Sequence, residues 1–306
     1  MAKALRIIFL GTPEFAVTSL RNLVESNYNV VAVITAPDKP KGRGKQMSTS
    51  AVKEYALTTG LPILQPTNLK SPEFLKELKS FKVDLQVVVA FRMLPVLVWS
   101  MPPLGTFNLH ASLLPQYRGA APINWAIING EKETGITTFF LKHEIDTGQI
   151  IFQEKEEIRE GDTVGSLYER LMERGGELVV KTVQAISKRN YPQIEQDVTR
   201  DLKSAPKIFR EDCEINWKQP SGKVIDFIRG LSPYPAAFTN LNEQNLKIYA
   251  VVKADEGSKT GIGEFESDGK HYLRFKTSDG AVDVLELQLQ GKKRMTIQDF
   301  LRGNQL

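Results

Sequence analysis

The chain has 306 residues, with an apolar fraction of 41% and a charged fraction of 25%, values of an ordinary soluble globular protein long enough for two domains. Its single cysteine, Cys213, excludes an internal disulfide, and its three scattered histidines predict no metal cluster. The net charge of +4 is mild, and the first apolar run is too short for a signal peptide or a membrane span, so we expect a cytoplasmic protein.

A strand and a helix are predicted first. Residues 5–10 are almost continuously apolar and lead into Gly11, which is typical of a buried parallel strand. Thr12 is the candidate N-cap of the following helix, with Pro13 at its first helical position, and residues 30–35 form a second apolar run. This β-α-β order predicts a parallel sheet with a right-handed crossover. The glycines match neither the dinucleotide-binding nor the Walker pattern, so neither ligand is indicated.

A basic loop follows the second predicted strand. Between Asp38 and Lys53 it carries five basic residues and one acidic residue, an excess of +4 that equals the charge of the whole chain; the cations are Lys39, Lys41, Arg43, Lys45 and Lys53. The loop leaves the carboxyl end of a strand, where open α/β folds bind ligands, and clustered cations attract phosphate. We therefore interpret it as an RNA-contacting loop, with a plain solvated loop as the alternative.

The centre of the predicted sheet is the run 83–91, the most apolar strand-like segment of the chain. Between the basic loop and this run, the spacing predicts a helix over 51–59, a strand over 61–66 and a helix over 72–79. The run is followed by a corner that contains Phe91, Arg92, Met93 and Leu94. A further strand over 104–110 leads into a turn made of Ser112, Leu113, Leu114 and Pro115.

Three polar residues around the last of these strands are candidates for catalysis. Asn108 and His110 are two residues apart, so a strand would project their side chains from one face. Asp146 begins an Asp-Thr-Gly turn between two strand-like runs, 134–142 and 149–158. A carboxylate there can orient the imidazole and fix its tautomer, while the amide donates to a developing oxyanion. These groups suit acyl transfer. The alternative is that His110 is a structural histidine without a catalytic role. The other histidine of this region, His143, is expected at the surface.

The remaining sequence predicts a change of architecture. Helices are expected over 120–128 and from a cap at Asp162 or Thr163 to about residue 188, followed by a polar linker over 190–209. A helix over 221–231 and short strand-like runs over 237–241, 246–253, 272–277 and 281–290 predict a small barrel similar to an OB fold. The basic residues Lys292, Lys293 and Arg294 follow, either meeting phosphate or forming a charged turn. We expect domains at 1–189 and 210–306.

Several of these motifs occur together in one family. The run Asn108-x-His110, the turn Ser112 to Pro115, the triplet Tyr117-Arg118-Gly119 and the turn Asp146-Thr147-Gly148 resemble the formyltransferases that use 10-formyltetrahydrofolate. The likeness extends over nearly the whole chain and is strongest toward members that act on methionyl-tRNA. It implies an α/β fold with an N-terminal Rossmann-like, mostly parallel sheet covered by helices on both faces, plus a smaller C-terminal OB-like β-barrel.

The resemblance also implies roles for residues. It makes Asn108, His110 and Asp146 catalytic, with direct attack of an amine on the formyl carbon and no covalent enzyme intermediate. It places the folate against the two segments that contain Phe91, Arg92, Met93, Leu94, Ser112, Leu113, Leu114 and Pro115, although many members have Tyr-Gly where this chain has Phe-Arg. It implies that the basic loop holds the tRNA acceptor stem and that Arg43 contacts it. The charge of the loop adds Lys39, Lys41 and Lys45 as candidate tRNA contacts. Lys292, Lys293 and Arg294, in a segment that resembles the C-terminal signature of the family, are candidate phosphate contacts.

We therefore predict a monomeric, metal-independent enzyme that transfers a formyl group from 10-formyltetrahydrofolate to the α-amino group of methionine on initiator methionyl-tRNA. A member of the same superfamily acting on glycinamide ribonucleotide or an amino sugar is the nearest alternative. The basic loop and the C-terminal domain favour a macromolecular acceptor instead. A catalytically silent RNA-binding or folate-storage protein is a further alternative, which the intact trio of Asn108, His110 and Asp146 disfavours.

Overall fold

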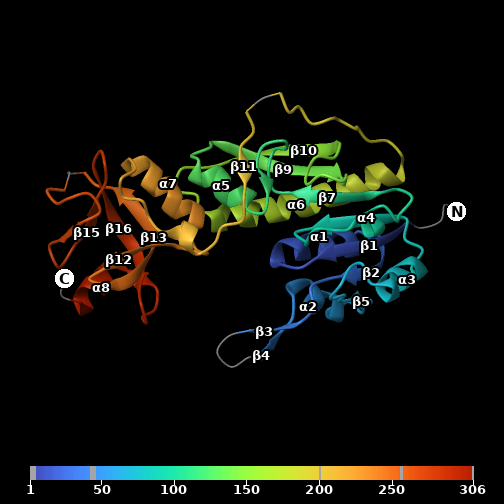
Figure 1. Ribbon diagram of the computed structural model, residues 1–306, viewed down its shortest axis with the longest axis horizontal. Coiled ribbons are helices and arrows are strands. Elements are labelled where there is room, and N and C mark those ends of the chain that lie inside the picture. The colour runs from blue at the N-terminus through green and yellow to red at the C-terminus, as the bar shows by residue number, and fades with distance from the viewer. Residues whose placement is uncertain (1–4, 42–45, 200, 256–257, 305–306) are drawn as a thin grey trace. The chain divides into compact units, whose positions relative to one another are not determined.

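The computed structural model describes residues 5–41, 46–199, 201–255 and 258–304 (Figure 1). The chain divides into two compact units. Unit 1 comprises residues 1–118, 135–156 and 168–203, and unit 2 comprises residues 119–134, 157–167 and 204–306. Within the described ranges, no helix is long and apolar enough to cross a membrane.

A seven-stranded sheet forms the core of unit 1, in the order β10-β9-β7-β6-β1-β2-β5. Its strands are β1 (Arg6–Gly11), β2 (Asn29–Ile34), β5 (Ile63–Leu64), β6 (Leu85–Val89), β7 (Thr106–His110), β9 (Glu133–Phe140) and β10 (Ile150–Glu157). The five strands from β7 to β5 are parallel, and β9 is antiparallel to β7. The mostly parallel sheet is thus confirmed, and the fully buried β6 occupies its centre, as the apolar run predicted.

The sheet of unit 1 is surrounded by α1 (Glu14–Glu25), α2 (Ala51–Thr58), α3 (Pro72–Ser80), α4 (Val96–Trp99) and most of α6 (Val164–Ser187). The predicted cap of α1 was wrong, because Pro13 and not Thr12 is the N-cap. Pro13 has an extended backbone, and its carbonyl accepts the first-turn hydrogen bond from the Ala16 amide at 3.0 Å. The helix therefore begins one residue later than expected, at Glu14.

Helices cover both faces of this sheet. On one face, β1 packs against α3 and α4 through an apolar cluster that includes Ile8, Phe74 and Val98. On the other face, Leu109 of β7 lies against α6 at Gly175, where an added Cβ would come within 2.7 Å of the leucine side chain. Because side chains alternate along a strand, the residues on either side of Leu109 face the side of the sheet that α3 and α4 cover.

Unit 2 contains an antiparallel sheet, ordered β12-β13-β16-β15-β14 with β17 paired to β16. The strands are β12 (Ala237–Leu241), β13 (Gln244–Lys253), β14 (Phe265–Ser267), β15 (Leu273–Lys276), β16 (Ala281–Leu289) and β17 (Met295–Thr296). The sheet curls into a half-barrel whose apolar core includes side chains of α7 (Ser221–Leu231) and α8 (Ile297–Gly303). A small OB-like barrel was expected here, and the structure has a small C-terminal β domain whose antiparallel sheet forms a half-barrel.

Shorter elements complete the chain: β3 (Lys39–Lys41), β4 (Gln46–Ser48), β8 (Arg118–Gly119), α5 (Pro122–Ile128), β11 (Ser204–Ala205) and a 3-10 turn at Glu211–Cys213. The start of α6 is capped as expected. Thr163 and Ser166 exchange hydrogen bonds between amide and hydroxyl at 3.1 and 3.3 Å, which satisfies two free donors of the first turn.

Candidate active site

Strand β7 presents Asn108 and His110 on one face at the carboxyl edge of the sheet. It lies parallel to β6, with Asn108 beside Val88 and Leu109 beside Val89, so the two strands end together. His110 is the last residue of β7 and only 7% exposed. Asn108 is half-buried, and its enclosed side-chain oxygen has no hydrogen-bond partner among the residues that the structure describes. The spacing of the two residues thus produces the expected pair of neighbouring polar side chains.

The two ring nitrogens of His110 face different partners. The Nε2 atom lies 2.8 Å from the backbone carbonyl oxygen of Tyr117, and the Nδ1 atom lies 3.9 Å from Oδ2 of Asp146. A carbonyl oxygen can only accept, so Nε2 carries the proton of the neutral ring and Nδ1 carries the lone pair. The expectation that Asp146 fixes the tautomer is therefore corrected, since the Tyr117 carbonyl does so. Asp146 instead faces the nitrogen that can gain a proton.

The Asp146 loop is held in a narrow range of conformations. Asp146 itself has a φ of 54°, in the left-handed region, and its side chain is 11% exposed. An added Cβ at Gly148 would lie 1.5 Å from the Phe140 carbonyl oxygen, so only glycine fits there. The Gln196 amide nitrogen donates to the carbonyl oxygens of Asp146 and Gly148, each at 2.8 Å. The carboxylate is therefore presented from a loop with little freedom.

The turn after β7 is built from internal hydrogen bonds. The buried hydroxyl of Ser112 donates to the Gln116 carbonyl at 2.6 Å, and the Ser112 carbonyl accepts from the Thr137 hydroxyl at 2.6 Å. Leu114 is buried in a small cluster with Phe139. Ser112 and Leu114 are thus used to shape the turn, while Leu113 and Pro115 remain half-buried.

The corner after β6 lies next to this turn, because β6 and β7 are adjacent. Its Arg92 guanidinium donates to the carbonyl oxygens of Pro66 and Thr67, the latter at 3.1 Å. Met93 is 74% exposed, whereas Leu94 is buried. The corner therefore presents Met93 to solvent and uses the Arg92 side chain to tie itself to the chain after β5. Phe91 lies beneath the guanidinium, 5.8 Å from ring centroid to Cζ.

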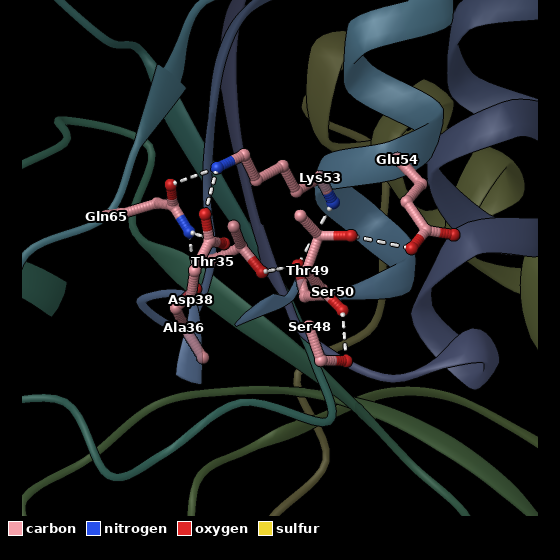
Figure 2. Close-up of polar contacts among 9 residues, drawn as sticks. All are labelled: Thr35, Ala36, Asp38, Ser48, Thr49, Ser50, Lys53, Glu54 and Gln65. Atoms are coloured by element: carbon pink, nitrogen blue, oxygen red, sulfur yellow. Dashed lines mark hydrogen bonds and ion pairs between the residues drawn. The ribbon is translucent and has the colours of Figure 1, made fainter. Parts of the chain in front are cut away.

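The basic loop contains an antiparallel hairpin, β3 paired with β4. Figure 2 shows the polar network at its base, where the Lys53 ammonium is 2.5 Å from the Asp38 carboxylate and 2.9 Å from the Gln65 amide oxygen. The Gln65 amide also donates to Asp38 at 2.8 Å. These hydrogen bonds, from Lys53 first and Gln65 second, lower the pKa of Asp38. The Ser50 hydroxyl caps α2 and lies 2.6 Å from the Thr35 hydroxyl. This contact holds the start of α2 against the end of β2.

This network changes how the charge of the loop is distributed. Lys53 and Asp38 form an ion pair with each other, so the formal excess of +4 is carried by Lys39, Lys41, Arg43 and Lys45. Lys39 is exposed in β3, and Lys41 ends that strand. Arg43 and Lys45 lie outside the described residues, so the structure does not place them.

The C-terminal basic trio is divided by its contacts. The Arg294 guanidinium is paired with Glu286 and lies over the Tyr249 ring, 4.3 Å from its centroid. Arg294, in the turn before β17, therefore binds side chains of β13 and β16 within unit 2. Lys292 and Lys293 are exposed.

Two residues beside the site, Arg118 and Gln196, were not among the predicted site residues. Arg118 belongs to the Tyr117-Arg118-Gly119 triplet, and Gln196 falls in the predicted linker.

His143 is exposed, as expected. Among the described residues, no group of three or more His, Cys, Asp or Glu side chains could hold a metal ion.

The fold and site define a class of protein, in which a mostly parallel sheet presents an amide, an imidazole and a carboxylate and is followed by an antiparallel β domain. A family model described as formyl transferase matches residues 5–183, and one described as formyl transferase, C-terminal domain, matches residues 207–305. The chain belongs to the formyl transferase family.

Individual relatives agree with this. The chain is 56% identical over 307 residues to a methionyl-tRNA formyltransferase of Bacteroides fragilis, covering 98% of this chain and 95% of the relative. It is 54% identical over 310 residues to one of Bacteroides thetaiotaomicron, covering 99% and 96%. Among solved structures, the sugar 3N-formyl transferase WlaRD, crystallised with dTDP and 5-N-formyl-THF, has a TM-score of 0.67 at 23% identity, covering 95% of this chain and 100% of WlaRD. That likeness shows the fold.

Proposed function

We propose that this chain transfers the formyl group of 10-formyltetrahydrofolate to the α-amino group of methionine on initiator methionyl-tRNA. The observation that carries the proposal is 56% identity to a methionyl-tRNA formyltransferase over 98% of the chain, which includes the C-terminal unit as well as the sheet. The basic hairpin supports it, because clustered cations bind the repeated phosphates of a nucleic-acid backbone, which a small amine acceptor lacks. We propose that the enzyme acts as a monomer in the cytoplasm.

The proposed reaction proceeds by direct attack. The neutral amine forms a bond to the formyl carbon, and Asn108 donates to the oxygen on which negative charge develops. The Nδ1 lone pair of His110 receives the amine proton, and the Asp146 carboxylate, 3.9 Å away, stabilises the imidazolium. Collapse of the intermediate breaks the bond from the formyl carbon to the folate nitrogen, which takes up the proton as it leaves. The products are formylmethionyl-tRNA and tetrahydrofolate.

For the folate, we propose a position across the ends of β6 and β7. The corner from Phe91 to Leu94 follows one strand and the turn from Ser112 to Pro115 follows its neighbour, so a ligand at this edge touches both. A crystal structure with a folate analogue should show the pterin on these two segments beside His110. An analogue bound elsewhere on the chain would contradict this assignment.

The proposed function is tested with charged tRNAs. Purified enzyme is incubated with 10-formyltetrahydrofolate and either initiator or elongator methionyl-tRNA, and the esterified amino acid is released and identified. We expect formylmethionine from the initiator tRNA at a clearly higher rate than from the elongator. Parallel incubations contain glycinamide ribonucleotide or an amino sugar nucleotide. Formylation of either small amine, without formylation of methionyl-tRNA, would overturn the proposal in favour of the alternative acceptor.

For the basic hairpin, we expect neutralisation of Lys39, Lys41, Arg43 and Lys45 to weaken tRNA binding and to flatten its dependence on log salt. Each lost phosphate contact should reduce that slope by roughly one unit, because fewer counterions are released. Filter binding over a range of salt concentrations measures this. A quadruple variant with normal affinity and normal salt dependence would show that the hairpin is only a solvated surface.

Arg43 should be distinguishable from its neighbours. Arg43→Lys keeps the charge but removes a planar guanidinium that can stack or form paired hydrogen bonds. We therefore expect this change to impair tRNA formylation more than Lys41→Arg does. Uncoupled hydrolysis of the formyl donor should be the same in both variants. Equal rates of tRNA formylation in the two variants would leave the hairpin with a role in charge attraction alone.

A further inference from the structure

The segment that follows α6 reaches back to the Asp146 loop. Ile194 pairs with Ile150 through two backbone hydrogen bonds of 2.8 and 3.0 Å. The Glu195 carboxylate accepts hydrogen bonds from Gln149 at 2.7 Å and from Lys142, at the two ends of the loop. Gln196 follows and contacts the backbone of the loop. The polar stretch expected to be a linker thus borders the candidate active site at its start.

The amide group of Gln196 is fully used. Its nitrogen donates to the carbonyl oxygens of Asp146 and Gly148 at 2.8 Å each, and its oxygen accepts from Arg118 Nε at 3.2 Å and from the terminal guanidinium nitrogen at 2.6 Å. Carbonyl oxygens cannot donate and a guanidinium cannot accept, so only one orientation of the amide satisfies all four contacts. Gln196 therefore lies in one fixed position between the two groups.

Those two groups bracket the imidazole of His110. Arg118 directly follows Tyr117, whose carbonyl holds the Nε2 side of the ring at 2.8 Å. Asp146 faces the Nδ1 side at 3.9 Å. Gln196 thus connects Arg118, next to Tyr117 on the Nε2 side of the ring, to the Asp146 loop on the Nδ1 side. A shift in this link would change the separation between the carboxylate and Nδ1, on which charge stabilisation depends.

We infer that Gln196, supported by Arg118, is a positioning residue that sets Asp146 against His110 for formyl transfer. The inference rests on the proposed function, in which Asp146 stabilises the protonated ring. Gln196 does not touch the reacting groups itself. It acts through the backbone of Asp146, so its contribution exists only while the carboxylate is present.

The test variant is Gln196→Glu. It keeps the length of the side chain and the pairing with Arg118, but it replaces the two N–H donors with an oxygen that faces two carbonyl oxygens. We expect kcat to fall by about 10- to 100-fold, the scale of a small misplacement of a catalytic group, with KM for the formyl donor and for tRNA within about twofold of wild type. Glu195→Gln is the matched control on the neighbouring exposed residue, and its kcat should stay within about twofold.

A double-mutant cycle separates positioning from general damage. On an Asp146→Ala background, Gln196→Glu should change kcat by less than about twofold, because no carboxylate is left to position. Thermal unfolding is recorded for each variant. If Gln196→Glu does not fold, Arg118→Lys carries the same test, since it removes the planar donor fork that holds the amide oxygen.

Two results would overturn the inference: an unchanged kcat in the single variant, or an equal loss with and without the Asp146 carboxylate. Failure of the proposed function is recognised separately, as a wild type that does not formylate methionyl-tRNA. If the wild type formylates another amine, the same cycle is run with that acceptor and has the same two contradicting outcomes.

Discussion

His110→Ala and Asp146→Ala should each lower the turnover of formyl transfer by at least about 10²-fold, the scale of acid–base and orienting groups. His110→Ala removes the lone pair that takes the amine proton, and Asp146→Ala removes the carboxylate 3.9 Å from it. Both side chains end at the carboxyl edge of the sheet without forming its core, so folate binding should survive. Steady-state kinetics measures the first effect, and calorimetric titration with a folate analogue measures the second.

The Asp146 loop offers controls for both changes. His143 and Glu144 are exposed there, so His143→Ala removes an imidazole and Glu144→Ala removes a carboxylate outside the site. Their turnover should remain within about twofold of wild type. Near-normal turnover in His110→Ala or in Asp146→Ala would show that the assigned role of that residue is wrong.

Gly148→Ala should be strongly damaging although it removes no polar side chain of the site. The new Cβ would overlap the Phe140 carbonyl oxygen, 1.5 Å away, and this backbone atom at the end of β9 cannot turn aside as a flexible side chain can. The loop must move, and Asp146 with it. We expect a loss of at least about 2 kcal/mol in the free energy of unfolding, typical of overpacking, together with a fall in kcat of at least about 10-fold.

Gly222→Ala is the matched glycine control. It lies in the first turn of α7, where an added Cβ meets no other atom within 4 Å. Its free energy of unfolding should change by no more than about 1 kcal/mol, in the stabilising direction that helix propensity gives. Denaturant unfolding compares the two variants. A Gly148→Ala variant as stable and as active as the Gly222→Ala variant would contradict the close approach.

Much of the fold was predictable because its signals are local. The run at residues 83–91 is apolar on both faces of the strand, and it becomes the central β6. Helix α3 begins at Pro72 after the cap residue Ser71, as its residue types indicate. The strand β14 was missed. It has only three residues, and all three are half-buried, so no alternation of buried and exposed side chains marks it. The cap of α1 was displaced by one residue, since a proline carbonyl can serve as the N-cap acceptor.

The sequence by itself determined that a mostly parallel sheet is followed by a small β domain. It also determined the placement of Asn108 beside His110, because the repeat of a strand puts every second residue on one face. Only the tertiary structure decided that the Tyr117 carbonyl holds Nε2, that Lys53 neutralises Asp38, and that Gln196 reaches a loop 50 residues earlier in the chain. These contacts join atoms that come together only when separate elements pack. All backbone carbonyls have the same chemistry, so the sequence around a carbonyl does not mark it as a hydrogen-bond acceptor. No residue pattern distinguishes the carbonyl that will be used, so its partner is fixed only when the sheet and loops are assembled.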